Sequence, residues 1–135
     1  MPENLKLNDT NSTRVPAADL RRQVSAIFQG VGTPEEHAET TAKILVSASV
    51  RGVDTHGAGN VIGYSRAIEN GVYTIPQTVE VITETDTTAL LSCGNGIGFV
   101  AAHRGMEIAI EKARNFGIGM TSIRDGHHIG MVGYY

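Results

Sequence analysis

The sequence predicts an α+β fold in which a pair of helices precedes a mixed α/β region. Residues 16–50 carry apolar positions at helical spacing on either side of a Gly-rich turn. Residues 79–91 contain two short apolar runs around a polar turn, which is typical of a β-hairpin. A long amphipathic stretch at 99–116 then leads into one more strand. With 135 residues, the chain is long enough to bury one hydrophobic core.

The composition excludes several classes of function. A net charge of -3 gives no basic excess that would hold a phosphate backbone, so we expect no nucleic-acid partner. No stretch approaches the roughly 20 apolar residues of a membrane span, and the first residues lack the apolar middle of a secretory signal. The single Cys93 cannot form an internal disulfide and follows an apolar run, as a buried reduced thiol does. We expect a cytoplasmic protein with no membrane contact.

The first predicted helix follows a polar amino terminus. Residues 1–14 carry too few apolar side chains to offset the entropy of ordering, so we expect a disordered tail. From Pro16 the apolar residues recur at helical spacing until the chain reaches Gly30. This periodicity predicts an amphipathic helix that ends at the Gly-rich turn.

A second helix is predicted to begin directly after that turn. Thr33 precedes Pro34, Glu35 and Glu36, an order in which the threonine hydroxyl can cap the amide of Glu36. Pro34 fits the first turn, where its missing N–H costs nothing. The periodicity then continues to about Val50, which predicts two consecutive helices joined by a short turn.

The rest of the chain predicts alternating helix and strand. A helix over the second half of 53–71 ends at Asn70-Gly71, and strands are expected at 79–83 and 89–91. The glycines of 94–98 stand between a strand and a helix, but their G-x-G-x-G spacing does not match the dinucleotide-binding G-x-G-x-x-G. We therefore predict a tight turn, followed by a helix over 99–116 and a strand over 118–123.

Asp54-Thr55-His56-Gly57 is the first segment that can carry chemistry. A histidine can give or take a proton near neutral pH, and Asp54 or Thr55 could orient its ring. The structural alternative is that Asp54 or Thr55 caps the following helix and His56 only packs nearby. For this motif in isolation the structural alternative is favoured.

Asn60 and Tyr64 lie four and eight residues beyond His56, and on a helix that starts near Ala58 they project to roughly the same side as the turn that carries His56. They could line a polar pocket. Tyr64 is alternatively a core aromatic residue with a satisfied hydroxyl, and Asn60 an ordinary first-turn residue.

A metal site is the weaker interpretation of the remaining histidines. His127 and His128 are adjacent on an extended segment and point apart, so only one could face a given ion. His37 and His103 are expected on helices without ligand partners four residues on. We therefore predict no bound metal. The loop after His128 is rich in glycine and could bring backbone amides to a phosphate or a nicotinamide, or could be a plain loop.

These segments together resemble the malate/L-lactate dehydrogenase family of NAD(P)-dependent oxidoreductases. The resemblance covers about residue 16 to the last residue and rests on the order of the segments. Those segments are Asp54 to Gly57, Tyr64, the glycine turn 94–98, the helix 99–116, and His127 to Gly130 followed by Gly133-Tyr134-Tyr135. The implied fold is a helical pair followed by the beginning of a cofactor-binding domain that is not a classical Rossmann fold. The implied organisation is a tail (1–14), a helical substrate and catalytic region (15–76) and the start of the NAD(P)-binding domain (77–135).

The resemblance also implies roles for individual residues. His56 would be the catalytic acid/base, assisted by Thr55, which replaces the family's usual serine, and by Asp54. Asn60 and Tyr64 would contact the substrate, but Asn60 stands where the family has an arginine that pairs with the substrate carboxylate, which leaves the substrate open. The implied contacts with NAD or NADP are His128, Ile129, Gly130, Met131 and Val132.

The implied function is hydride transfer between NAD(P)H and a 2-oxo or 2-hydroxy acid such as malate or lactate, in an enzyme that is a homodimer at full length. Family members are much longer, so the chain corresponds to their amino-terminal portion, and we expect negligible activity from it alone because catalysis needs several positioned groups. Two alternatives belong to other classes. One is a non-catalytic helical interaction module with an uncovered apolar face on 99–116, and the other is a metal-dependent lyase or hydrolase using His56, His127 and His128.

Overall fold

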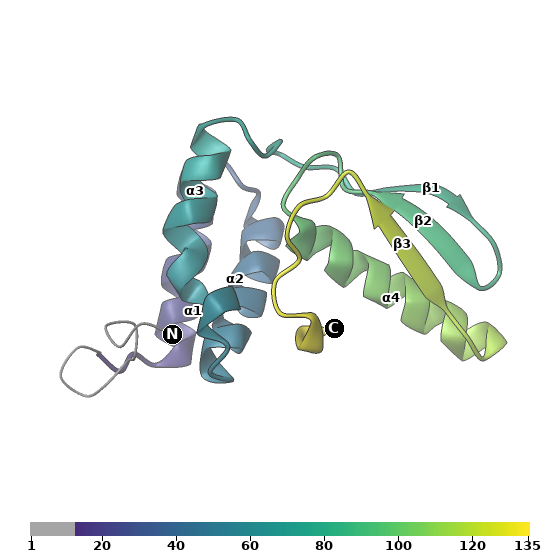
Figure 1. Ribbon diagram of the computed structural model, residues 1–135, viewed down its shortest axis with the longest axis horizontal. Coiled ribbons are helices and arrows are strands. Elements are labelled where there is room, and N and C mark those ends of the chain that lie inside the picture. The colour runs from purple at the N-terminus through teal and green to yellow at the C-terminus, as the bar shows by residue number, and fades with distance from the viewer. Residues whose placement is uncertain (1–12) are drawn as a thin grey trace.

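Three helices form one end of the molecule. The computed structural model of the chain describes residues 13–135, and most of the predicted tail lies outside the described residues. The helices are α1 (Ala17–Gly30), α2 (Glu35–Val50) and α3 (Val61–Glu69). They stand side by side, while α4 and the sheet form the other end (Figure 1). The predicted helical pair and the third helix are confirmed.

The start of α2 differs from the sequence prediction. Thr33 makes no capping hydrogen bond, and its buried Oγ1 has no partner among the described residues. The reason lies in the preceding helix, because the Thr33 N–H donates to the carbonyl of Phe28 at 3.0 Å and holds this residue against the end of α1. Pro34 is the residue that caps α2, so the predicted capping by Thr33 is wrong.

The second half of the chain builds a small mixed sheet with one helix on it. Strands β1 (Glu80–Glu84) and β2 (Thr88–Ser92) form the predicted antiparallel hairpin, and β3 (Met120–Arg124) pairs with β2 in parallel. The helix α4 (Gly98–Phe116) connects β2 to β3 and packs on one face of the sheet (Figure 1). Gly117 ends α4 in the left-handed conformation with a φ of 83°.

The core consists of two clusters of buried side chains. The larger one joins α1, α2 and α3 to the start of α4, where Phe28, Leu45 and Phe99 are fully buried. The smaller one lies between the sheet and α4 and is built around Leu91 and Ile108. Because Phe99 belongs to the larger cluster, the first turn of α4 is fixed against the helical end of the molecule.

The predicted glycine turn lets two segments approach closely. Gly98 begins α4 beneath the segment that follows β3, and a Cβ at this position would lie only 2.5 Å from the carbonyl oxygen of His127 and 2.8 Å from that of His128. Real Cβ atoms do not approach this closely. The absence of a side chain at Gly98 therefore allows the segment with both histidines to lie across the start of α4.

None of the described helices is long and apolar enough to cross a membrane. The apolar face predicted for residues 99–116 is divided between two environments. Phe99 and Ala109 are buried, whereas Met106 and Ile110 are 36% and 44% exposed.

Gly119 offers a test of the contact between α4 and β3. A Cβ on Gly119 would overlap the backbone carbonyl of Ala109, so Gly119→Ala forces the helix and the strand apart. We expect the free energy of unfolding, measured by chemical denaturation, to fall by about 1–3 kcal/mol. Gly63→Ala is the control, because Gly63 lies within α3 with open space around it, and it should stabilise the protein by about 1 kcal/mol. Equal effects of the two substitutions would contradict this packing.

Candidate active site

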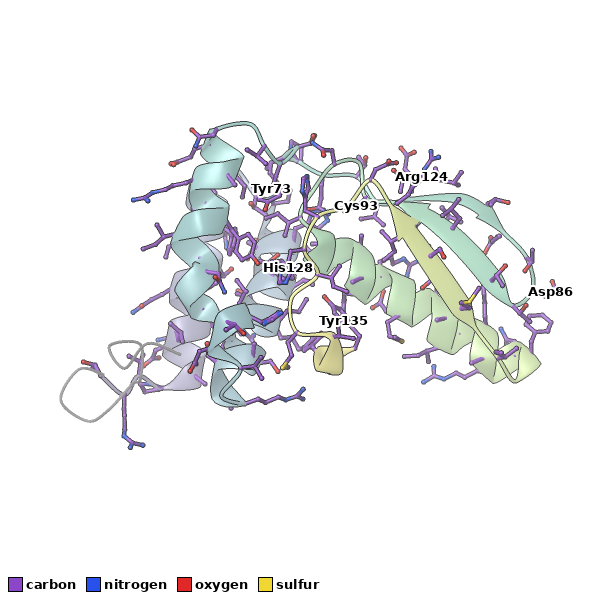
Figure 2. The ribbon with its side chains drawn as sticks, in the orientation of Figure 1. Tyr73, Asp86, Cys93, Arg124, His128 and Tyr135 are labelled. Atoms are coloured by element: carbon purple, nitrogen blue, oxygen red, sulfur yellow. The ribbon has the colours of Figure 1, made fainter. Side chains whose placement is uncertain are left out.

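Two histidines from distant parts of the chain form the centre of the candidate site. His56 ends a short 3-10 turn, η2 (Asp54–His56), and His128 lies four residues after β3. Their ring centroids are 5.1 Å apart with planes tilted by 38°. His128 lies between α3 and the start of α4 (Figure 2). The structure thus brings together two residues that the sequence analysis assigned to different functions.

Thr55 holds the His56 ring on one side. Its Oγ1 lies 2.8 Å from Nδ1 of His56, which leaves the Nε2 edge of the ring for another partner. No side chain caps η2, the turn that follows it or α3, so the capping alternative for Asp54 and Thr55 is wrong. Asp54 is exposed at the start of the turn.

Two polar side chains fix the backbone around His56. Ser49 on α2 accepts a hydrogen bond from the Ala58 N–H at 2.9 Å, and the absence of a side chain at Gly57 makes room for its Oγ. From the other side, Nδ2 of Asn60 donates to the carbonyls of Thr55 at 3.0 Å and Gly57 at 3.3 Å. The sequence analysis missed Ser49, because no local pattern relates it to a turn nine residues later.

His128 is held as a neutral ring with its proton on Nε2. The Gly130 N–H lies 3.2 Å from Nδ1 of His128 and can only donate to it, so Nδ1 accepts and carries no hydrogen. The hydroxyl of Tyr64, 2.8 Å from the same atom, must then also donate. Burial lowers the pKa of His128, and the neighbouring His56 lowers it further. This environment favours the neutral form of the ring.

Tyr64 connects this site to the core. Its ring packs edge to face on Phe99 at 5.4 Å, and Phe99 also contacts the His128 ring at 6.2 Å. Burial raises the pKa of the Tyr64 hydroxyl, with a smaller contribution from Tyr73. Tyr64 therefore packs against the core as an aromatic residue with a satisfied hydroxyl and also contacts His128, while its role towards a substrate stays a prediction.

His127 points away from the imidazole pair, as the alternation of an extended segment predicts. Its Nε2 lies 3.0 Å from Oδ1 of Asn95, and its ring packs edge to face on Tyr73 at 4.6 Å. No group of three His, Cys, Asp or Glu side chains within residues 13–135 is placed to hold a metal ion.

The loop after His128 is held against the core and against the last residue of the chain. Gly130 is buried with a φ of 80° against Phe99, and the carbonyl of Ile129 accepts a hydrogen bond from the Tyr135 hydroxyl at 2.7 Å. Met131 is buried, whereas Val132 is 70% exposed. The exposed part of this predicted cofactor segment is therefore the ring of His128 and the side chain of Val132.

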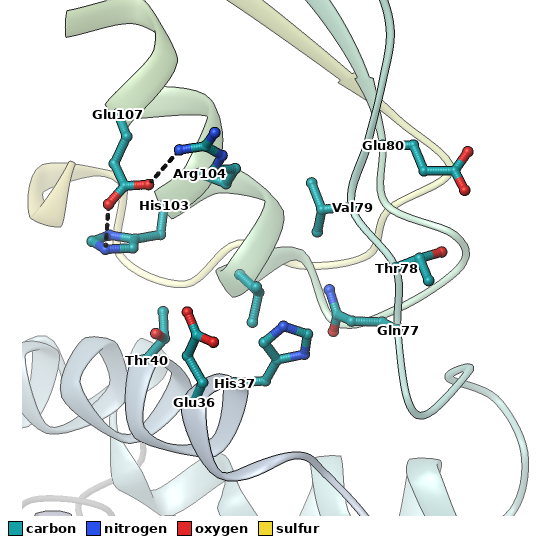
Figure 3. Close-up of a pocket in the computed structure, with 11 residues that line it drawn as sticks. Glu36, His37, Thr40, Gln77, Thr78, Val79, Glu80, His103, Arg104 and Glu107 are labelled. Atoms are coloured by element: carbon teal, nitrogen blue, oxygen red, sulfur yellow. Dashed lines mark hydrogen bonds and ion pairs between the residues drawn. The ribbon is translucent and has the colours of Figure 1, made fainter. Parts of the chain in front are cut away.

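A separate groove of about 530 Å³ lies between α2, α4 and residues 77–80 (Figure 3). None of the predicted site residues lines it. His103 on its wall lies 3.7 Å from the Glu107 carboxylate, which also accepts a hydrogen bond from Arg104 at 3.2 Å. The expectation that His103 has no possible ligand partner four residues on is wrong, because a carboxylate stands there.

The titration of His128 tests this geometry. Its pKa should lie below the ordinary value of 6.5, as NMR titration of the ring signals would measure. Because the folded state then binds fewer protons than the unfolded chain, this group's contribution to stability is complete above pH 6.5 and is lost as the pH falls through the folded-state pKa. His56→Asn should raise the pKa only partly, since burial, the larger cause, remains. A pKa of His128 above 6.5 would contradict this partly desolvated environment beside a second imidazole.

Comparison with known proteins gives one consistent result. The pattern of the malate/L-lactate dehydrogenase family matches residues 15–135. The malate/(S)-sulfolactate dehydrogenase of Methanothermus fervidus is 38% identical over 115 residues, which are 85% of this chain and 34% of that protein. Hydroxycarboxylate dehydrogenase B of Escherichia coli strain K12 is 33% identical over 90% of this chain and 34% of that protein.

A solved structure agrees in fold. The malate dehydrogenase of Pyrococcus horikoshii OT3 superposes with a TM-score of 0.92 and 35% identity, over 96% of this chain and 37% of that one. The chain thus spans about a third of the length of the relatives it matches. The match covers nearly all the described elements, including both histidine segments. The chain therefore belongs to the malate/L-lactate dehydrogenase family.

Proposed function

We propose that this chain forms the proton-transfer part of an oxidoreductase that moves hydride between NAD(P)H and a 2-oxo or 2-hydroxy acid. The observation that carries the proposal is the imidazole pair, His56 and His128, with ring centroids 5.1 Å apart. Membership of the family supports it, because the related proteins are named as malate, sulfolactate and hydroxycarboxylate dehydrogenases.

His56 is the residue we assign to proton transfer. Reduction of a carbonyl group adds hydride to carbon and a proton to oxygen, and oxidation of the alcohol returns both. Two imidazoles this close do not both carry charge readily. Because Nδ1 of His128 accepts hydrogen bonds and carries no hydrogen, we assign the transferred proton to His56, whose Nδ1 contacts Thr55. His56 can therefore donate from Nε2 to the carbonyl oxygen and recover the proton in the reverse direction.

His128, the second imidazole, has a different role. With its proton on Nε2, neutral His128 can donate a hydrogen bond to the same oxygen and stabilise the negative charge that develops there. Tyr64 and Gly130 hold the ring in this tautomer. Thr55 orients His56 through its contact with Nδ1, and Asp54 lies exposed at the start of the same turn.

One edge of a nicotinamide site fits the segment from His128 to Val132. A nicotinamide ring needs an apolar surface and a few polar groups, and here the exposed Val132 side chain lies four residues from an imidazole donor. The bound NAD or NADP would supply the hydride. Ile129, Gly130 and Met131 would support this edge from behind, since Gly130 and Met131 are buried and the Ile129 carbonyl is bound by Tyr135.

The other expectations stand as parts of the same proposal. The division at residue 76, a homodimer at full length and a cytoplasmic location stay predictions. The metal-dependent alternative and the non-catalytic module are not favoured, because the relatives are named as dehydrogenases over the same residues.

The proposal is tested on the full-length enzyme that contains this chain, by the oxidation of NADH and NADPH in the presence of 2-oxo acids, followed by the loss of cofactor absorbance. His56→Asn should lower the rate about 10²- to 10⁴-fold, the usual contribution of a general acid. His103→Asn is the matched control, since His103 lies in the separate groove, and should leave the rate unchanged. If His56→Asn keeps full activity and His128→Asn loses it, the proton-transfer role belongs to His128 and not to His56.

A further inference from the structure

Asn60 lies against the turn that carries His56. It precedes the first residue of α3 and lies four residues before Tyr64, on the same side of that helix, and its amide contacts the carbonyls of the two residues that flank His56. Tyr64 contacts His128 from that side, and Asn60 is half-buried there. A substrate held at the two imidazoles would therefore lie beside the Asn60 amide.

The hydrogen-bonding capacity of this amide is already half used. Nδ2 of Asn60 donates to the carbonyls of Thr55 and Gly57, the two residues that flank His56. An NH₂ group has two hydrogens, so both are engaged. Oδ1 has no hydrogen-bond partner within residues 13–135. Towards a ligand, Asn60 can therefore act as an acceptor and not as a donor.

The charged groups around Asn60 also disfavour a bound carboxylate. Asp54 adds a negative charge to the turn. In the described part of the chain, no hydrogen bond or ring contact of His56, Asn60 or Tyr64 involves a lysine or arginine, and the guanidinium of the nearby Arg51 is bound to the Gly133 carbonyl at 2.7 Å. A carboxylate placed against Oδ1 would lose its water and meet another acceptor, which is unfavourable.

We propose that the substrate group that meets Asn60 is a neutral hydrogen-bond donor, such as a carboxamide or a hydroxyl, and not a carboxylate. The substrate class is then the 2-oxo and 2-hydroxy acids whose second polar group is uncharged. This inference rests on the proposed function for the position of the substrate. It assigns Asn60 two tasks, which are to fix the turn that carries His56 and to select the donor group.

Two ligands of equal length test the inference. A four-carbon 2-oxo diacid and its ω-amide differ only in one carboxylate against one carboxamide. Binding to the 135-residue protein is measured by NMR, from the shifts of the Asn60 side-chain amide and of the His56 and His128 rings. The ω-amide should bind about tenfold more tightly than the diacid, the size expected for one hydrogen bond gained in place of one repulsion.

Substitutions at Asn60 sharpen the test. Asn60→Arg supplies a cation that can pair with a carboxylate, so the preference should reverse in favour of the diacid. Asn60→Leu keeps a similar volume without the acceptor and should abolish the preference. Asn115→Arg adds the same charge near the end of α4, at the opposite end of the molecule from α3 (Figure 1), and should leave the preference unchanged.

The outcomes separate this inference from the proposed function. Equal or tighter binding of the diacid to the unsubstituted protein, or no response to either ligand, would overturn the inference, and this comparison needs no variant to fold. Preferential binding of the ω-amide without any oxidation of NADH or NADPH by the enzyme would support the inference and argue against the proposed reaction. If the enzyme oxidises the cofactors and the diacid is the better substrate, the proposed reaction is supported and the inference about Asn60 is contradicted.

Discussion

The candidate site depends on the hydrogen bonds that converge on Nδ1 of His128. The Gly130 N–H and the Tyr64 hydroxyl both donate to this atom, and each fixes something different. Gly130 sets the tautomer, because a backbone N–H cannot accept. Tyr64 ties the segment after β3 to α3, sixty-four residues earlier in the chain. This contact helps to fix the position of the imidazole pair, whose two members belong to different halves of the fold.

Small residues make this convergence possible. Gly98 lets the carbonyls of His127 and His128 lie across the start of α4, and Gly57 admits the hydroxyl of Ser49 against the turn that carries His56. In both places a backbone segment is fixed by close contact with a rigid helix. Side chains that must keep a defined geometry are best supported in this way, because a helix buried on one face moves little. The hydrophobic cluster around Phe99 is thus part of the site as well as of the core.

The polar groups around His56 show how an amide can serve structure and selection together. The side-chain hydrogens of Asn60 bind the carbonyls of Thr55 and Gly57, and its side-chain oxygen remains available. An arginine at this position would be free to extend towards a ligand, but it could not place the same two donors so close to the turn. The charge at the site and the rigidity of the turn are therefore linked through one residue.

The sequence by itself determined the order of the elements and most of their boundaries, because periodicity, glycine and proline act over a few residues. It also determined that His127 and His128 point apart, and the order of its motifs carried the family resemblance. Only the tertiary structure decided that His128 pairs with His56, that Ser49 supports the Gly57 turn, and that Thr33 contacts α1 instead of capping α2. Contacts of this kind join residues whose separation leaves no local pattern, so they follow from packing and hydrogen bonding in the folded chain.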